Sequence, residues 1–449
     1  MPWTEISKGH YQRQIGENET FIKLIGDSGA PLEREHWAIN ADAAFKRNKS
    51  ISEEDFLQHL KAAWQILRFH HPSIAAIASG TQIDYTVPDQ QELQRWLSET
   101  FHVHKYQTRE DVVAAHKPTP YVVLHYFPAQ SEILMHTSHW RTDGIGILQL
   151  MNAFLDLVGS EATLPDPGSL AWGEEPARLA PCVEDAANIP AVATEEVKVE
   201  AEKWTKTFHG AVGAVGIEFT PAKDGLPGGT RSARDLLSES TTEAIVGSCK
   251  AQNISVTSAI HAALAETNWA FAAPEDRSKH WLSTIRAGLR PYLPEPYSTP
   301  AYASGLYTSG YMHSLPAGRS FAQNAKQINE LYRAGLRPAF LQAHRQYALN
   351  LTELIKNTPP DAPPGSGADI SSLGLVEKML GPKHGSLEVL SVNVGVEVLT
   401  PQMTLFVWTF RGRLEMNLVY NEAFYEAERP AKFLKSLKST LLTELGVQT

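Results

Sequence analysis

Cysteine is almost absent from this chain: Cys182 and Cys249 are the only two among 449 residues, and they form no CxxC pair. A disulfide framework needs several cysteines, and a thiolate zinc site needs cysteines at short spacings, so both are excluded. Such cysteine usage is typical of a reducing compartment, and we expect a cytoplasmic protein.

Basic residues and long apolar runs are scarce as well. The chain has 40 Lys and Arg against 50 Asp and Glu, a formal net charge of -10, and it contains no basic run. We therefore expect no nucleic-acid partner. No 18 uncharged apolar residues run together, and the opening stretch MPWTEISKGHYQRQ has no apolar segment of the signal-peptide kind. Neither membrane insertion nor secretion is expected.

The motifs of several large enzyme classes are missing. The sequence has no GxxxxGK[ST], no GxGxxG after a strand, no GxSxG and no HExxH. The sequence therefore gives no support for a P-loop, Rossmann, α/β-hydrolase or zincin enzyme. The pairs His102/His104 and His136/His139 lack a third ligand at a typical spacing, so we interpret them as packed or solvated histidines and expect no metal.

The length and composition predict a globular protein of two domains. Apolar residues make up 43% of the 449 residues, and one compact core seldom organises so long a chain. Pro, Gly and acidic residues dominate from about 160 to 195, which indicates a connecting segment. We place the domains at 1–175 and 199–449, joined by 176–198. Strand-like and helix-like patterns interleave in both, which favours an α/β or α+β fold.

The clearest local patterns lie in the first half. Apolar residues recur with helical spacing over 52–68, ahead of Pro72. Segments 120–127 and 131–139 resemble two strands of a hairpin, and 143–159 has helical periodicity. In the second half we expect helices near 195–209, 240–252 and 256–271, strands near 214–220, 280–287, 304–313 and 386–399, two helical stretches between 317 and 357, a Pro/Gly gap (NTPPDAPPGSGAD), a hairpin turning at Gly412, and a helix from 429.

One motif combines a titratable ring with a carboxylate. In HWRTDG, a predicted strand ends at His139, and Asp143 and Gly144 begin the next predicted helix. An imidazole with a pKa near 6.5 is suited to removing a proton at neutral pH. HxxxDG is the signature of acyltransferases related to chloramphenicol acetyltransferase, which include the plant BAHD enzymes and the condensation domains of peptide synthetases. The chain resembles this superfamily.

Further segments carry the same resemblance. They are AAWQILRFHHPSIAA, ISVTSAIHAALAETNWAFA, LRPYLP, SSLGLVE and LVYNEAFYEAERPAKFLKSL. Together they are most similar to the stand-alone fungal branch that includes trichothecene 15-O-acetyltransferase. The DFGWG segment of the plant enzymes is absent, and Ser138 stands where condensation domains carry the first of two histidines. An ordinary carrier-protein condensation domain is therefore disfavoured.

The resemblance implies a fold and a reaction. The fold has two subdomains, each a mixed sheet with packed helices, which face each other around a tunnel. His139 would lie at the midpoint of the tunnel and act as general base for the attack of an alcohol on an acyl thioester. The protein would be a monomer without a bound cofactor. It would use acyl-CoA, with acetyl-CoA as the expected donor, as co-substrate and a small-molecule alcohol as acceptor.

Asp143 has a structural role in this scheme. The Asp143-Gly144 turn would direct the carboxylate away from the substrate, where it caps the helix and accepts hydrogen bonds from an arginine. By analogy with the family, Arg286 and Arg290 are the candidate partners, and the sequence does not choose between them.

Other candidates concern substrate binding. Ser391 and Asn393 share one side of a predicted strand and are candidate oxyanion donors, although neighbouring groups more often satisfy such residues. Trp408 and Tyr420 would line the acceptor pocket or belong to the core.

We therefore expect an acyl-CoA-dependent O-acyltransferase that acts on a hydroxyl of a hydrophobic secondary metabolite. Two alternatives stay open. One is a condensation-like enzyme that catalyses cyclisation or carrier-protein-dependent formation of an ester or amide. The other is an inactive relative that only binds ligands.

Overall fold

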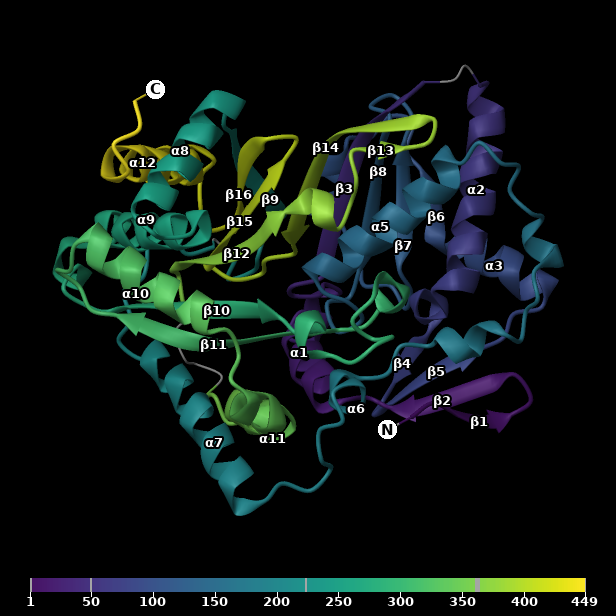
Figure 1. Ribbon diagram of the computed structural model, residues 1–449, viewed down its shortest axis with the longest axis horizontal. Coiled ribbons are helices and arrows are strands. Elements are labelled where there is room, and N and C mark those ends of the chain that lie inside the picture. Colours follow the sequence, from purple (N-terminus) through teal and green to yellow (C-terminus); the bar gives the residue numbers. More distant parts are fainter. Residues whose placement is uncertain (1, 49–50, 223, 360–363, 449) are drawn as a thin grey trace. The chain divides into compact units, whose positions relative to one another are not determined.

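The computed structural model describes residues 2–48, 51–222, 224–359 and 364–448, and its elements are labelled in Figure 1. The contacts within the chain divide it into two units. Unit 1 consists of Met1–Pro190, Gly288–Thr308 and Val376–Glu397, and unit 2 consists of Ala191–Ala287, Ser309–Leu375 and Val398–Thr449.

These units differ from the linear limits expected from the sequence. The first change of unit, at residue 190, falls inside the expected connection 176–198, but 288–308 and 376–397 belong to unit 1 rather than to a domain at 199–449. For 376–397 the reason is a strand pairing, because β14 (Leu387–Val396) runs antiparallel to β3 (Ile39–Arg47). A sheet recruits strands from distant parts of a chain, and a linear reading of composition does not detect this.

The main sheet of unit 1 has six strands in the order β13-β14-β3-β8-β7-β6. Only β6 and β7 are parallel; the other pairs are antiparallel. Besides β14 and β3, its strands are β13 (Lys383–His384), β8 (Glu132–Thr137), β7 (Val123–Phe127) and β6 (Phe101–Val103). The predicted hairpin of 120–127 and 131–139 is confirmed as β7 and β8.

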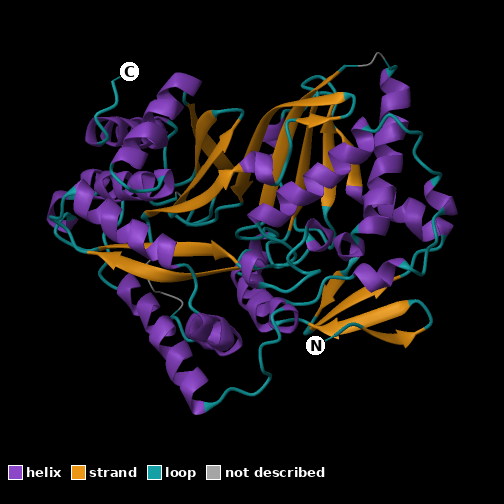
Figure 2. Ribbon diagram, viewed as in Figure 1, coloured by secondary structure: helices purple, strands orange, loops and turns teal. Residues whose placement is uncertain are grey.

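Two long helices cover one face of this sheet. Phe56 of α2 (Glu53–His70) contacts the rings of Phe45 on β3 and Tyr126 on β7, and α5 (Gly144–Gly159) packs on α2, β3 and β14. Figures 1 and 2 show both helices lying along the strands. Both were predicted from apolar periodicity, and both are confirmed.

The rest of unit 1 consists of shorter elements that the sequence did not indicate. A small antiparallel sheet has the order β1-β2-β5-β4. The elements are β1 (Thr4–Ser7), β2 (His10–Gln14), α1 (Glu17–Asp27), β4 (Ile77–Ser79), β5 (Gln82–Thr86), α3 (Gln90–Thr100), α4 (Arg109–Ala114) and α6 (Val183–Ala186). Helix α4 contributes Val112 to a small cluster with Phe127 and Leu134, on the opposite face of the six-stranded sheet from α2.

Unit 2 has a four-stranded sheet and a separate two-stranded ribbon. The sheet has the order β12-β15-β16-β9, with β12 and β15 parallel, and the ribbon pairs β10 with β11. The strands are β9 (Thr230–Leu236), β10 (Trp281–Gly288), β11 (Thr308–Leu315), β12 (Ala368–Leu375), β15 (Met403–Phe410) and β16 (Arg413–Asn421). The chain turns at Gly412 with φ 72°, as predicted for the hairpin, because glycine adopts this left-handed conformation without strain.

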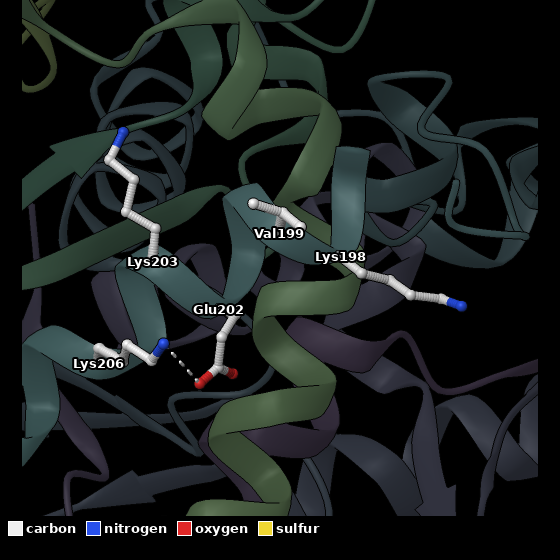
Figure 3. Close-up of a pocket in the computed structure, with 5 residues that line it drawn as sticks. All are labelled: Lys198, Val199, Glu202, Lys203 and Lys206. Carbon is white, nitrogen blue, oxygen red and sulfur yellow. Dashed lines mark ion pairs between the residues drawn. The ribbon is translucent and has the colours of Figure 1, made fainter. Parts of the chain in front are cut away.

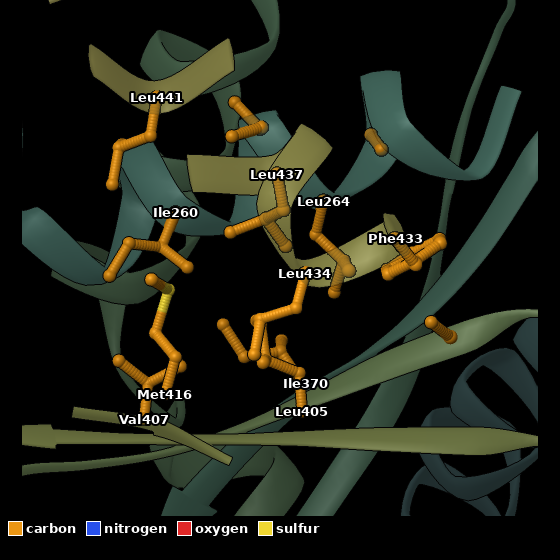
Figure 4. Close-up of a cluster of buried hydrophobic side chains, with 14 of the residues drawn as sticks. Ile260, Leu264, Ile370, Leu405, Val407, Met416, Phe433, Leu434, Leu437 and Leu441 are labelled. Atoms are coloured by element: carbon orange, nitrogen blue, oxygen red, sulfur yellow. The ribbon is translucent and has the colours of Figure 1, made fainter. Parts of the chain in front are cut away.

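Helices cover this sheet and enclose its apolar core. Leu264 of α9 and Leu434 and Leu437 of α12 point toward Leu405 and Ile370 of the strands (Figure 4). The helices of unit 2 are α7 (Glu195–Thr205), α8 (Glu239–Ala251), α9 (Val256–Phe271), α10 (Phe321–Ala334), α11 (Pro338–Lys356) and α12 (Glu428–Glu444). All six were expected at these places, since their apolar residues recur at helical spacing.

One expected strand of unit 2 is wrong. Residues 214–220 form no strand but an extended connection, in which Val215 N donates to His280 O and Ile217 N donates to Ser366 O. Val215 and Ile217 are buried in the core, and two alternate apolar residues in an extended segment resemble a strand in sequence. The second Pro/Gly gap includes residues 360–363, which lie outside the described residues. None of the described helices combines the length and apolar character needed to cross a membrane.

Candidate active site

His139 lies in the short connection between β8 and α5. Its Nδ1 is 3.1 Å from the backbone oxygen of Thr142. A carbonyl oxygen only accepts hydrogen bonds, so Nδ1 must carry the hydrogen in this contact. In the neutral ring the lone pair is then on Nε2. The connection therefore fixes which nitrogen of His139 can act as a base.

Arg141 holds this connection against the rest of unit 1. Its side chain is buried, and burial lowers its pKa to about 10. The guanidinium donates to three backbone oxygens, those of Ser73, Ala76 and Pro120. Thr142 is held as well, since its Oγ1 donates to Ala303 O at 2.8 Å. The residues after His139 are thus fixed by buried hydrogen bonds.

Asp143 caps the first turn of α5 and binds an arginine. Its Oδ1 accepts from the backbone N–H groups of Ile145 at 3.0 Å and Gly146 at 2.9 Å. Arg290 Nη1 lies 2.7 Å from both carboxylate oxygens, and Tyr307 N donates to Oδ2 at 2.9 Å. These donors occupy both oxygens, so the contacts of Asp143 join the start of α5 to Arg290 and Tyr307, and its supporting role in catalysis stays a prediction.

The structure distinguishes the two arginine candidates. Arg290 is buried with Asp143, whereas Arg286 of β10 is a residue of unit 2 and pairs with Asp369 at 2.9 Å. Burial opposes ionisation of Asp369, but Arg286 and two hydroxyl donors keep the pKa of this carboxyl below its usual value. The donors are Ser283 and Thr284. Arg286 is therefore part of a separate network around the buried Asp369.

Two glycines follow Asp143, and they have different roles. Gly144 is the first residue of α5. At Gly146 an added Cβ would lie 2.1 Å from Ala303 O and 2.8 Å from Arg290 Nη2. Only glycine allows this close approach of the helix to the 288–308 segment. Gly146 was not among the site residues expected from the sequence, although a second glycine two residues into a predicted helix was a detectable signal.

The side-chain amide of Asn393 is hydrogen-bonded to a residue of the neighbouring strand. On β14 it lies directly across from Asp42 of β3, and its Nδ2 donates to Asp42 Oδ2 at 2.9 Å. Asp42 also accepts from Arg109 at 3.0 Å, so Asn393 joins a buried ion pair. Ser391 lies on the same strand, just past a register irregularity, opposite Ala44. These contacts describe a structural role for Asn393, and an oxyanion role for Ser391 and Asn393 stays a prediction.

The two aromatic candidates are buried strand residues of unit 2. Trp408 on β15 is 1% exposed and lies across from Glu415 of β16. Tyr420 on β16 is 5% exposed and belongs to the apolar core of the unit. Both positions suit a packing role, and their place in an acceptor pocket stays a prediction.

Several histidines cluster on the face of the six-stranded sheet that α4 covers. His136 Nδ1 donates to Asn40 Oδ1 at 3.0 Å, and the rings of His116 and His136 stack with centroids 3.6 Å apart. Burial lowers the pKa of His136 to about 4. Within the described residues, no group of three or more His, Cys, Asp or Glu side chains is arranged to hold a metal ion. We therefore interpret these histidines as packed neutral rings.

A surface hollow of about 590 Å³ lies along α7 in unit 2 (Figure 3). It is lined by Lys198, Val199, Glu202, Lys203 and Lys206, and it contains none of the site residues expected from the sequence. Each lysine pairs with a glutamate of the same segment, at distances of 2.7 to 3.8 Å. These pairs neutralise the charge, so the hollow is not a built anion site.

Known proteins resemble this chain along its whole length. Acetyltransferase pigO of Monascus ruber is 46% identical over 100% of this chain and 99% of that protein. O-acetyltransferase pigM of the same organism is 31% identical over 100% of this chain and 88% of that protein. No protein-family model matches the chain.

The fold has a close counterpart among solved structures. The trichothecene 15-O-acetyltransferase TRI3 of Fusarium sporotrichioides superposes with a TM-score of 0.82, at 18% identity, over 98% of this chain and 97% of that one. Fold and sequence together define an acyltransferase. The chain belongs to the family of fungal acetyltransferases that includes pigO and pigM, and it has the fold of TRI3.

Proposed function

We propose that this enzyme transfers an acetyl group from acetyl-CoA to a hydroxyl of a hydrophobic secondary metabolite, with His139 as general base. The observation that carries the proposal is the hydrogen bond from His139 Nδ1 to Thr142 O. It leaves Nε2 as the basic nitrogen in the neutral ring. The names of the two Monascus relatives support acetyl as the transferred group.

The proposed reaction passes through one tetrahedral intermediate. The acceptor oxygen attacks the thioester carbonyl carbon while Nε2 of His139 takes the hydroxyl proton. The intermediate then collapses, the carbon–sulfur bond breaks, and the departing thiolate takes the proton from the imidazolium. A positioned base of this kind contributes roughly 10²- to 10⁴-fold to the rate. No covalent acyl-enzyme is needed.

Asp143 and Arg290 contribute by holding the base in place. Binding both substrates in line contributes about 7 to 11 kcal/mol to catalysis in well-oriented reactions, and small misplacements reduce this strongly. The Asp143 carboxylate joins the start of α5 to Arg290 and Tyr307. We expect these contacts of Asp143 to hold His139 in the position that proton transfer from the acceptor requires. That a tunnel leads both substrates to His139 stays a prediction, as do a monomeric state and a cytoplasmic location.

The experiment is an assay with acetyl-CoA and a panel of hydrophobic alcohols, read by free thiol and by product mass. We expect release of CoA in step with a product heavier by one acetyl group, and loss of both signals in His139→Ala. A product formed without consumption of CoA would instead indicate cyclisation. Ligand binding without any turnover would indicate an inactive relative, and either result would overturn the proposal.

A further inference from the structure

A carboxyl group lies beside the residue that precedes His139. Ser138 Oγ donates to Glu35 Oε2 at 2.9 Å. The backbone of Ser138 is held too, since its oxygen accepts from Arg141 N at 3.2 Å. Ser138 is 6% exposed, so these bonds form away from bulk water. His139 therefore follows a residue whose side chain and backbone are both fixed.

Hydrogen bonds of the backbone and packing against α1 hold Glu35 in place. It belongs to the segment that leads into β3, where Ala38 N donates to Glu35 O at 3.2 Å and Trp37 N donates to Glu397 O at 2.7 Å. A Cβ on Gly26 of α1 would lie 3.1 Å from both Cγ and Oε1 of Glu35, so the side chain packs closely against this helix. The carboxyl is thus packed against α1 and directed at Ser138.

The groups around Glu35 allow it to change charge near neutral pH. Burial is the largest influence and raises the pKa of Glu35 to about 7, while the hydrogen bond from Ser138 opposes this rise. The charged groups that act on its carboxyl are Arg141 of the loop and Lys23 and Asp27 of α1. The Glu397 carboxylate, which pairs with Arg34, accepts a hydrogen bond from the backbone of Glu35. An imidazole with an ordinary pKa of about 6.5 titrates in the same range.

We propose that Glu35 is a positioning residue for acyl transfer, which fixes His139 through Ser138 and adjusts the proton affinity of the imidazole through its own charge. This inference rests on the proposed function, since it concerns the same base. Glu35 lies outside the HxxxDG motif, more than 100 positions before it in the sequence. Its contribution differs from that of Asp143, because Glu35 titrates near neutral pH and acts on the residue before His139.

The inference predicts a change in the pH profile. A negative charge on Glu35, which is hydrogen-bonded to the residue before His139, favours the protonated imidazole and so raises the pKa of the base. In Glu35→Gln this charge is gone, and the acidic limb of kcat/KM should move down by about 0.5 to 1 in pH. We expect kcat to fall about 5- to 10-fold with little change in KM, a modest loss compared with that from a removed base.

Ser138→Ala provides a second, independent variant. Without the Ser138 hydroxyl, the charged form of Glu35 loses a hydrogen bond, so Glu35 stays protonated to higher pH. The acidic limb should therefore move in the same direction as in Glu35→Gln. The double variant should show no further movement, because both changes act through one contact. Glu33→Gln is the matched control, since Glu33 is an exposed carboxylate that pairs with Lys117 at the surface.

The pH profiles of wild type, both single variants, the double variant and the control form one experiment. Profiles of Glu35→Gln and Ser138→Ala that superimpose on that of wild type would overturn the inference. The same holds if Glu33→Gln shifts the limb as far as Glu35→Gln does. A wild-type enzyme that transfers no acyl group to any acceptor is a different result, and it would refute the proposed function instead.

Discussion

Arg290 Nη1 lies 2.7 Å from both carboxylate oxygens of Asp143, although 147 positions separate the two residues in the sequence. Both side chains are buried, at 5% and 3% exposure. Arg290 Nη2 also donates to the backbone oxygens of Ala303 and Gly305. This pair therefore joins the start of α5 to the 288–308 segment in the interior of unit 1.

We expect Arg290→Met to destabilise the protein strongly. The change leaves the Asp143 carboxylate buried without its counter-charge, which typically costs about 3 to 5 kcal/mol. Urea unfolding followed by circular dichroism measures the loss. Arg95→Met is the control: Arg95 pairs with Glu92 at the surface, where an ion pair contributes about 0 to 1 kcal/mol. Equal losses in the two variants would contradict the structural role of Arg290.

A second prediction concerns the glycines in helices. In Gly146→Ala the new Cβ would lie 2.1 Å from Ala303 O, so the helix must move and we expect a loss of about 1 to 3 kcal/mol. Gly247→Ala in α8 is the matched control, because nothing lies within 4 Å of its added Cβ. It should stabilise by about 0.5 to 1 kcal/mol, the usual helical gain of alanine over glycine. Unfolding midpoints of the two variants that shift in the same direction would refute this account.

The buried histidines predict a loss of stability in acid. Burial lowers the pKa of His136 to about 4 in the folded protein, while the unfolded value is about 6.5. The unfolded chain thus binds a proton that the folded one excludes, and stability falls as the pH drops from about 6.5 toward 4. Between pH 7 and pH 5 this one ring accounts for about 2 kcal/mol.

His136→Gln tests this dependence, since its amide does not titrate. The difference between the free energies of unfolding at pH 7 and pH 5 should be smaller in the variant than in wild type by about 2 kcal/mol. His116, which stacks on His136, should keep part of the dependence, because burial lowers its pKa too. An unchanged difference between the two pH values would show that His136 takes up its proton alike in the folded and unfolded states, which contradicts this account.

Local patterns predicted much of the fold because their causes are local. The apolar stripe of α2 behind Ser52, whose Oγ accepts from Asp55 N, marks a helix in any context. The turn at Gly412 follows in the same way from one glycine. The strands β9 and β13 left no such signal, and the pairing of β14 with β3 depends on contacts between distant segments.

Some residues of the candidate site could likewise be predicted from local sequence, and others could not. The HxxxDG pattern identified His139 and Asp143, and the capping role of Asp143 follows from its place before a helix. The choice of Arg290 over Arg286 required coordinates, since both arginines lie within five positions of the same segment. Glu35 and Arg141 carried no signal, because their partners lie in other parts of the chain.

The most direct test of the central claim is the turnover of His139→Ala with acetyl-CoA and an accepted alcohol. We predict that kcat/KM falls by roughly 10²- to 10⁴-fold, the contribution of a general base, while the urea midpoint stays that of wild type. His10→Ala, which removes another partly buried histidine of unit 1 that pairs with Asp84, should keep its activity. A folded His139→Ala enzyme within tenfold of the wild-type rate would contradict the assignment of His139 as the base.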